Sequence, residues 1–325
     1  MVRPLVSVLI NNHNYGEFLD DAIQSVLRQT YENIELIVVD DGSTDNSRDV
    51  IARYGNSIIP VLTANLGQAS AYNAGFAFSR GELICLLDSD DVFLSTKVER
   101  LVDVFERFPT AGWLRHRLEI TDEHLRPLGV RIPHYKGSRL ERIKEGMWLE
   151  HKARFVNSSA IAMRRITTAS ILPIPKSRVH EWKLGADGYI GVLCAATSPC
   201  YSLDEPLTYY RRRDAQRFTG RAGVTAYLDR SVRRDRRFSQ MWTSTAGPSG
   251  LASDYYKHQL VLASLNGVPR WSRERRTTLL SGLRAVGPLA MAYPNLAARQ
   301  VAALGVAFLA PDIWIRRFMR MVAIS

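Results

Sequence analysis

Short apolar runs alternate with segments of helical apolar spacing over the first hundred residues. The runs Val6–Ile10, Leu36–Val39 and Leu83–Leu87 predict strands, and the last is apolar throughout, as in a strand buried on both faces. Ile58–Leu62 predicts a shorter strand, near a sheet edge because of its proline. Helical spacing is seen in Phe18, Ala22, Ile23, Val26 and Leu27. This alternation predicts an α/β domain with a mainly parallel central sheet flanked by helices.

The pattern is less regular after residue 110. It predicts strands over Trp113–Ile120, Ser158–Met163 and Leu207–Arg211 and a helix over Asp187–Ala196. Beyond residue 220 the chain is rich in Ala, Leu and Arg at helical spacing, interrupted by prolines. We therefore expect three parts, residues 1–110, 111–220 and 221–325, of which the first two form one continuous domain and the last is a helical C-terminal appendage.

Charge is distributed unevenly along the 325 residues, with a net −3 for residues 1–206 and +14 for residues 207–325. A basic tail suits nucleic acid, anionic lipid or a phosphorylated acceptor, and charge alone does not choose among them. The three cysteines have neither the number nor the spacing of a disulfide or zinc framework. The N-terminus shows no pattern of a signal peptide, so we expect the protein in the cytoplasm.

Polar residues collect where the predicted strands end. Asn11–Asn14 follow the first strand, Asp40 and Asp41 the second, and Asp88–Asp91 the fourth. In open α/β sheets the ligand binds outside the carboxyl ends of the strands. This common position predicts an active site formed by these three segments.

Asp88, Asp90 and Asp91 place three carboxylates where the chain leaves a buried strand. Like charges at that separation repel one another unless a cation neutralises them. Hard oxygen ligands in small number suit Mg²⁺ or Mn²⁺ bridging a diphosphate. The alternative is an acidic loop with an aspartate as a helix N-cap; the position after a central strand favours the metal.

The second cluster runs from Asp40 to Asp45. A carboxylate here suits hydrogen bonds to a base or ribose hydroxyl, and Gly42 permits a close turn. Ser43 and Thr44 are candidate N-caps for the next helix. Capping explains such residues but not two adjacent aspartates before a glycine.

Together these motifs resemble the inverting family 2 glycosyltransferases, which have the GT-A fold. The resemblance covers roughly residues 5–220, in ordered motifs at compatible spacings. The matching segments are Val6–Ile10 with Asn14, Ser25–Glu35, Val39–Asp45, Asn65–Gly67 with Ala71, Asn73 and Gly75, Gly81–Glu82, Leu87–Asp91, Glu205–Leu207 and Tyr210–Arg211. It implies that residues 1–110 bind the nucleotide sugar, that residues 111–220 bind the acceptor, and that the donor is by default a UDP-sugar.

The resemblance also implies roles for single residues. Asp88 and Asp90 match the DxD pair that holds the metal, and Asp187 matches the catalytic base. The remaining donor-binding residues expected are Asn11, His13, Asn14, Asp40, Asp41, Asn65, Gly67, Asp88, Asp91 and Arg211. His13 either stacks on the nucleobase or only forms hydrogen bonds within its loop. The family often has an acidic residue before its base, whereas Ala186 stands here, and an aspartate at a helix start is also a common cap.

The implied reaction is a single inverting displacement. Asp187 would take the proton of the acceptor hydroxyl while the cation stabilises the departing diphosphate. Processive members of the family carry a Gln-x-x-Arg-Trp motif and several transmembrane helices, and neither is found here. We therefore expect transfer of one sugar to a saccharide or lipid-linked acceptor, in surface polysaccharide or glycolipid assembly.

The C-terminal segment around Trp314–Val322 sets apolar residues beside Arg316, Arg317 and Arg320. One interpretation is an amphipathic helix lying peripherally on the inner face of the membrane. The alternatives are a helix packed on the catalytic domain or in a homodimer interface. The apolar stretch Val301–Ala310 is too short to span a bilayer, which takes about 20 residues.

Four other functions compete with sugar transfer as explanations of the sequence. A nucleotidyltransferase or an NAD-dependent enzyme would carry a glycine-rich phosphate loop after the first strand, which Asn11–Asn14 do not supply. A nucleic-acid-binding protein would leave the strand-end carboxylates unexplained, because they repel phosphate without a metal. A non-catalytic sugar-nucleotide-binding protein with a retained fold stays as the alternative.

Overall fold

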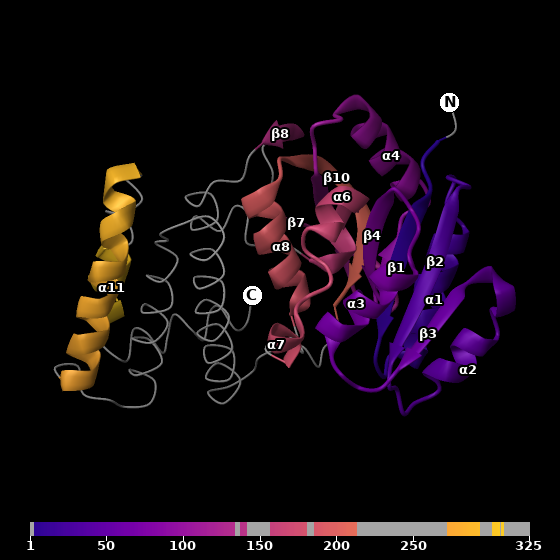
Figure 1. Cartoon of the computed structure of the whole chain (residues 1–325), viewed down its shortest axis with the longest axis horizontal. Helices are drawn as coiled ribbons and strands as arrows, with labels where there is room; N and C mark the ends of the chain where they lie inside the picture. The colour runs from indigo at the N-terminus through magenta and orange to yellow at the C-terminus, as the bar shows by residue number, and fades with distance from the viewer. Residues whose placement is uncertain are drawn as a thin grey trace. The chain divides into compact units, whose positions relative to one another are not determined.

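The computed structural model describes residues 3–133, 137–141, 157–180, 185–212, 272–292, 301–305 and 307–308. The chain divides into two compact units, one made of Met1–Ile143 with Phe155–Arg212 and the other of Lys144–Arg154 with Arg213–Ser325. The first unit contains the sheet (Figure 1). It spans both predicted halves of the α/β domain, and a boundary at residue 110 stays a prediction.

Ten strands form one twisted sheet in the described part of the first unit. Their bounds are β1 Val6–Asn12, β2 Ile34–Asp41, β3 Ile59–Thr63, β4 Leu83–Asp88, β5 Val92–Phe93, β6 Trp113–Thr121, β7 Pro127–Ile132, β8 Arg139–Glu141, β9 Ile161–Arg164 and β10 Cys200–Arg211. The predicted strands of the first hundred residues are thus confirmed within one or two residues at each end.

The order of the sheet is β3-β2-β1-β4-β9-β6-β10-β5, with β7 paired to β6 and β8 to β10. The strands β3, β2, β1 and β4 are all parallel. The antiparallel β9 then joins β4 to β6, and β6 and β10 are again parallel. β3 lies at the edge, as its proline predicted. The predicted α/β class is confirmed. The four adjacent parallel strands of the sheet all come from the first hundred residues.

Helices cover the sheet and connect its strands (Figure 1). In the first unit these helices are α1 Gly16–Leu27, α2 Ser47–Ala52, α3 Gln68–Phe78, α4 Lys97–Arg107, α6 Arg165–Ala169, α7 Lys176–Val179 and α8 Ala186–Thr197, with 3-10 turns η1 Gly55–Ser57 and η2 Ser158–Ala160. The helix α11 Arg273–Ala292 belongs to the second unit. The helix predicted over Asp187–Ala196 is therefore confirmed as α8.

The core lies between the sheet and the apolar faces of its helices. Leu19, Ile23 and Val26 of α1 recur at helical spacing and pack with the buried residues of β1, β2 and β4. On the other face α3 approaches closely, because a Cβ added at Gly75 would lie 3.2 Å from Val39. Burial of these apolar side chains is the main favourable term in folding.

Three local expectations differ from the structure. α2 begins at Ser47, and its first amide donates to Asp45 Oδ1 at 3.0 Å, so Ser43 and Thr44 are not its caps. Leu27 lies at the exposed side of α1. The strand expected over Ser158–Met163 begins with the turn η2, because Asn157 accepts a hydrogen bond from the amide of Ser159 and bends the backbone.

In the second unit the described residues are helical, in α11 and over 301–305 and 307–308. Among the helices that the structure describes, none combines the length and the apolar composition needed to cross a membrane. The predicted amphipathic helix around Trp314–Val322 lies outside the described residues, as does most of the predicted part 221–325.

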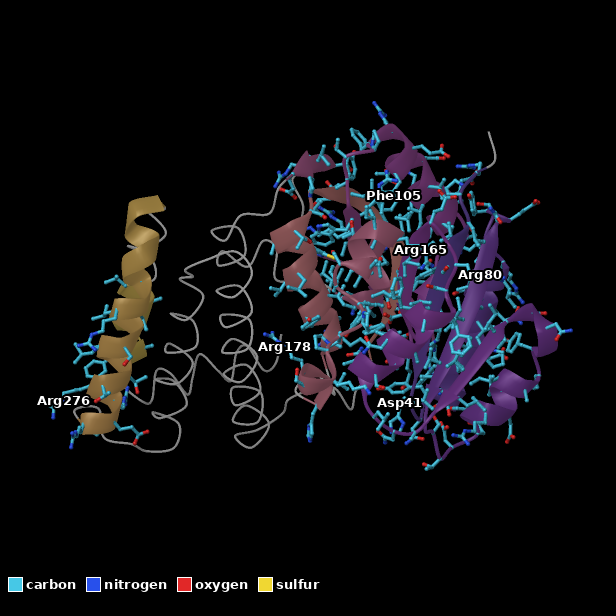
Figure 2. The ribbon with its side chains drawn as sticks, viewed as in Figure 1. Asp41, Arg80, Phe105, Arg165, Arg178 and Arg276 are labelled. Atoms are coloured by element: carbon cyan, nitrogen blue, oxygen red, sulfur yellow. The ribbon has the colours of Figure 1, made fainter. Side chains whose placement is uncertain are left out.

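A buried carboxylate fixes the end of the sheet opposite the predicted site. Glu35, near the start of β2, accepts hydrogen bonds from Ser7 Oγ at 2.5 Å and from the amides of Arg80 and Gly81. Figure 2 shows Arg80 well apart from Asp41, the last residue of β2. Burial acts to raise the pKa of Glu35, but these hydrogen bonds outweigh it and hold the pKa below its ordinary value.

We expect Glu35→Gln to lower the free energy of unfolding by about 1 to 3 kcal/mol at pH 7, because the buried amides lose a charged acceptor. The pKa of Glu35 is lower in the folded protein than in the unfolded chain. Its stabilising effect is therefore fully present above the ordinary pKa of glutamate and is lost as the pH falls through the pKa of Glu35 in the folded protein. Urea unfolding at pH 7 and pH 3.5 measures this. The exposed Glu32→Gln serves as control, and an equal effect of both substitutions would contradict the assignment.

Candidate active site

The strand register joins the polar segments that the sequence singled out. In the parallel sheet Asn11 lies beside Asp88 on β4, and Asn12 lies beside Asp40 on β2. Neighbouring strands are about 4.8 Å apart, so these side chains form one continuous edge at the carboxyl ends of β2, β1 and β4. Both polar atoms of the Asn11 side chain are buried and have no hydrogen-bond partner among the residues that the structure describes.

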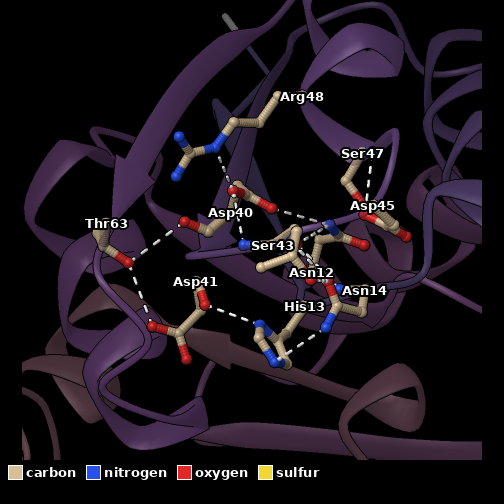
Figure 3. A network of polar contacts seen from close by, with 11 residues as sticks. Asn12, His13, Asn14, Asp40, Asp41, Ser43, Asp45, Ser47, Arg48 and Thr63 are labelled. Atoms are coloured by element: carbon tan, nitrogen blue, oxygen red, sulfur yellow. Dashed lines mark hydrogen bonds and ion pairs between the residues drawn. The ribbon is translucent and has the colours of Figure 1, made fainter.

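Asp40 is fully buried and organises the turn after β2 (Figure 3). Its carboxylate accepts hydrogen bonds from Asn12 Nδ2 at 3.0 Å, from the amide of Ser43 at 3.2 Å and from Arg48 Nε at 3.0 Å. Gly42 follows with φ +71°, and a Cβ there would lie 2.5 Å from the backbone nitrogen of Asn65. The predicted close turn is thus present. Asn12 belongs to the predicted segment Asn11–Asn14, but the sequence analysis gave it no role of its own.

Asp41 organises a different loop, Asn65–Gly67, which precedes α3. Its two carboxylate oxygens accept from the amide of Leu66 at 2.9 Å and from the amide of Gly67 at 2.7 Å. Gly67 has φ +94°, a conformation that favours glycine. The two adjacent aspartates therefore have separate tasks, since one shapes its own turn and the other fixes the loop beside it.

His13 joins these two loops (Figure 3). Its Nδ1 donates to the carbonyl of Asp41 at 2.8 Å, and its Nε2 accepts from Asn65 Nδ2 at 3.2 Å, as in a neutral imidazole. Asn14 has φ +58° and accepts from the amide of Thr44 at 2.7 Å. The hydrogen-bonding alternative for His13 is thus observed, and stacking on a nucleobase stays a prediction.

The acidic loop Asp88–Asp91 ends β4. Asp88 Oδ2 accepts from Ser158 Oγ at 2.5 Å, and the Asp88 amide donates to Ser159 Oγ at 3.0 Å. The loop continues into β5, and the next helix begins only at Lys97 after Thr96. The alternative of an aspartate as helix cap is therefore wrong. Ser158 and Ser159 were not singled out in the sequence, because their role depends on β9 pairing with β4.

The carboxyl groups of this loop disfavour one another's charge. Burial, the charge of Asp90 and the charge of Asp187 raise the pKa of Asp88 to about 7. Burial, Asp90 and Asp88 likewise raise the pKa of Asp91 well above its ordinary value. One Asp91 oxygen, Oδ2, is buried without a hydrogen-bond partner. A cation at this place would relieve the repulsion and lower each of these pKa values.

The donor set fits a divalent cation that shares its ligands with a substrate. Among the described residues no three His, Cys, Asp or Glu side chains gather closely enough to hold a metal by themselves. Mg²⁺ is typically held by one or two carboxylates together with substrate phosphates. Asp88 and Asp90 supply such hard oxygens, and further ligands would come from a bound diphosphate.

A buried lysine lies behind the acidic loop and was missed in the sequence. Lys97 Nζ donates to the carbonyl of Ser159 at 2.7 Å and to Thr208 Oγ1 at 3.0 Å. Burial lowers the pKa of Lys97 to about 7, against the opposing influence of Cys85 and Asp91. Lys97 precedes Val98 and Leu101 on the buried face of α4, so a lysine at a core position was the available signal.

Asp187 comes to the same edge from a distant part of the sequence. It is half-buried in the first turn of α8, and its Oδ1 accepts from the amide of Gly188 at 2.8 Å. Its charge helps to raise the pKa of Asp88, of the buried Tyr72 and of the half-buried Tyr210. The predicted base and the acidic loop thus belong to one electrostatic cluster. Tyr72 was missed, since an aromatic residue in a helix usually signals only core packing.

Each nitrogen of the Arg211 guanidinium group donates a hydrogen bond within the protein. Its Nε donates to the carbonyl of Asp90 at 3.0 Å, its Nη1 to the carbonyl of Glu123, and its Nη2 to Asp21 Oδ2 at 2.7 Å. Its amide also donates to Asp91 Oδ1. In this structure Arg211 holds the acidic loop in place, and its contact with a diphosphate stays a prediction.

Known proteins resemble this chain over much of its length. Residues 7–167 match the family model described as glycosyl transferase family 2. An uncharacterized glycosyltransferase of Nostoc sp. is 37% identical over 227 residues, which cover 68% of this chain and 69% of the relative. An Escherichia coli enzyme is 37% identical over 102 residues, covering 31% of this chain and 40% of its own length; it is named UDP-Glc:alpha-D-GlcNAc-diphosphoundecaprenol beta-1,3-glucosyltransferase.

The fold has counterparts among solved structures. The structure of Staphylococcus aureus TarS 1-349 in complex with UDP-GlcNAc superposes with a TM-score of 0.62 and 15% identity, covering 98% of this chain and 90% of that chain. Identity at that level shows the shared GT-A fold alone. The family model and the long match to the Nostoc relative establish that the chain belongs to glycosyltransferase family 2.

Proposed function

We propose that this glycosyltransferase is an inverting, metal-dependent enzyme that moves one sugar from a nucleotide-diphospho-sugar, by default a UDP-sugar, to a hydroxyl acceptor. The observation that carries the proposal is that Asp187, from a distant part of the chain, lies close enough to Asp88 for its charge to help raise the pKa of Asp88. A carboxylate near a strand-end pair of aspartates suits a base beside a metal-diphosphate site.

The donor would lie along the edge formed by β2, β1 and β4. Asp40, Asp41, His13 and Asn65 face one another there in a network of hydrogen bonds that includes Asn14 and Gly67. We assign the nucleoside to this end and the diphosphate to the end near Asp88 and Asp91. Asn11 stands between them, and its unpartnered amide is suited to a ligand hydroxyl or phosphate oxygen.

Asp88 and Asp90 would hold Mn²⁺ or Mg²⁺, which supplies positive charge to the departing diphosphate when bound. Arg212, exposed beside the engaged Arg211, is a further cation near this end. Asp187 takes the proton of the acceptor hydroxyl. The acceptor oxygen then bonds to C1 from the face opposite the diphosphate, the bond from C1 to the diphosphate oxygen breaks, and its electron pair leaves with the nucleotide.

The acceptor is proposed to be a lipid-linked or free saccharide in surface polysaccharide or glycolipid assembly. Support comes from the name of the E. coli relative, a glucosyltransferase acting on a GlcNAc-diphosphoundecaprenol. We further propose that the enzyme transfers a single sugar, that it acts in the cytoplasm, attached peripherally to the inner face of the membrane, and that it forms a homodimer. The basic tail, with a net charge of +14 over residues 207–325, favours binding to the anionic membrane surface.

Donor binding is tested by thermal shift with UDP, GDP and dTDP, each with and without Mn²⁺. We expect one nucleotide with metal to raise the melting temperature by several degrees, because a ligand at 100 times its Kd stabilises by about 2.7 kcal/mol. Asp90→Ala should abolish the rise. Asp103→Ala, which removes an exposed ion pair with Arg3, should keep it. Stabilisation that survives Asp90→Ala would contradict the metal assignment.

Asp187→Asn preserves the shape of the side chain but removes the base. We expect kcat for transfer to fall by a factor of about 10² to 10⁴, with the donor Kd unchanged. The rate is measured as release of UDP from a UDP-sugar donor, with a short-chain lipid diphosphate of N-acetylglucosamine as the acceptor. A variant that binds donor and turns over like the wild type would instead favour the alternative of a non-catalytic sugar-nucleotide-binding protein.

Metal-nucleotide binding should depend on pH. Asp88 must be ionised to bind a cation, and its pKa without metal is raised to about 7. The Kd for Mn²⁺-UDP is therefore expected to fall roughly tenfold from pH 6 to pH 8, as the carboxyl loses its proton. Titration calorimetry across this range measures it. Asp88→Asn should bind weakly at every pH, and a Kd of the wild type that is constant with pH would contradict the expectation.

A further inference from the structure

The helix that carries the proposed base has no cap of its own. α8 begins at Ala186 after Gly185, whose φ is +77° and which has no side chain to accept a hydrogen bond. The first amides of a helix have no partner within it, and a buried amide without a partner costs free energy. Ala186 is fully buried, so its amide requires an acceptor from elsewhere in the protein.

Gln68 supplies that acceptor. Its Oε1 accepts from the amide of Ala186 at 2.8 Å, across 118 positions of the sequence. Gln68 is the first residue of α3, and it follows directly on Gly67, whose amide is held by Asp41. The hydrogen bond therefore ties the residue before Asp187 to the loop Asn65–Gly67, at the proposed nucleoside end of the site.

The other end of the same amide group reaches the acidic side of the site. Gln68 Nε2 donates to the hydroxyl of Tyr72 at 3.3 Å. Tyr72 is buried next to Asp88 and Asp187, whose charges with burial raise its pKa well above the ordinary value. Ser158, a further hydrogen-bonding neighbour of Tyr72, donates to Asp88 at 2.5 Å. One glutamine thus connects the backbone of the base with the surroundings of the proposed metal ligand.

We propose that Gln68 is a positioning residue for sugar transfer, which fixes the start of α8 and so holds the Asp187 carboxylate in place relative to the bound donor. The inference rests on the proposed function, in which Asp187 is the base. Gln68 acts through the backbone at Ala186 and not by touching the reacting atoms. Displacement of a catalytic group by about 1 Å is enough to lower a rate a hundredfold.

The test compares Gln68→Leu, Gln68→Glu and a matched control, Gln29→Leu. Gln29 also accepts from a backbone amide, that of Val98 at 2.9 Å, and donates through its Nε2, but these partners, Ser25, Leu94 and Val98, belong to neither α3 nor α8. Steady-state release of UDP from the UDP-sugar donor, with the same lipid-linked N-acetylglucosamine diphosphate as acceptor, gives kcat and KM. Hydrogen exchange over residues 185–190 reports the start of α8 whether or not turnover is seen.

We expect Gln68→Leu to lower kcat on the order of ten- to a hundredfold with less than a threefold change in donor KM, and to speed exchange over residues 185–190. Gln68→Glu keeps an acceptor for Ala186 and should restore much of kcat. Its added negative charge should also move the acidic limb of the pH-rate profile to higher pH, by raising the pKa of the base. Gln29→Leu should lower Tm without these effects.

A double substitution separates this inference from the proposed function. If Gln68 acts through Asp187, Gln68→Leu should cost little further activity in the Asp187→Asn background. Full activity of Asp187→Asn alone would overturn the assignment of the base. A large loss in Asp187→Asn, with kcat and exchange of Gln68→Leu equal to those of the wild type, would overturn only the role of Gln68. A kcat loss in Gln29→Leu equal to that in Gln68→Leu would also overturn it.

Discussion

The mutual repulsion of carboxylates at the end of a buried strand is the constraint on which the site depends. β4 carries apolar residues to the middle of the sheet and ends in Asp88, and the acidic loop turns back within hydrogen-bonding distance of β10. Arg211 donates to the carbonyl of Asp90 and, from its amide, to the carboxylate of Asp91, while Ser158 donates to Asp88. These contacts hold the loop in place, but burial and the neighbouring charges still raise the pKa of Asp88 and of Asp91.

The carboxylates at the end of β2 have a different role, which is to order the surrounding loops. Asp40 and Asp41 use their charges to bind amides and side chains of the protein, so that two loops and the first turn of α3 are ordered before any ligand arrives. Preorganisation of this kind lowers the entropy that binding has to overcome. The site thus combines one half that is ordered by hydrogen-bonded aspartates with an acidic half in which the carboxylates repel one another. Gln68 lies where the two halves meet.

Much of this could be predicted from residues in their order along the chain. The apolar run Leu83–Leu87 signalled a buried strand, Pro60 an edge strand, and the polar clusters after β1, β2 and β4 a common position at one end of the sheet. These inferences hold because strand period, proline geometry and the position of strand ends are local properties. Ser158 and Tyr72 escaped notice for the opposite reason, since nothing near them in sequence distinguishes them from ordinary loop or core residues. For Lys97 the sequence offered a charged residue at a core position, but its partners Ser159 and Thr208 come from distant parts of the chain.

The sequence by itself determined the alternation of strands and helices, the carboxylates at the strand ends and the family motifs, because each is written in adjacent or regularly spaced residues. Only the tertiary structure decided which residues share the site from far apart in the chain: Ser158 with Asp88, Arg211 with Asp90, and Gln68 with Ala186. The reason is physical. A buried amide or carboxylate takes whatever partner the packing of the sheet and its helices brings within about 3 Å, and that neighbour is not encoded locally.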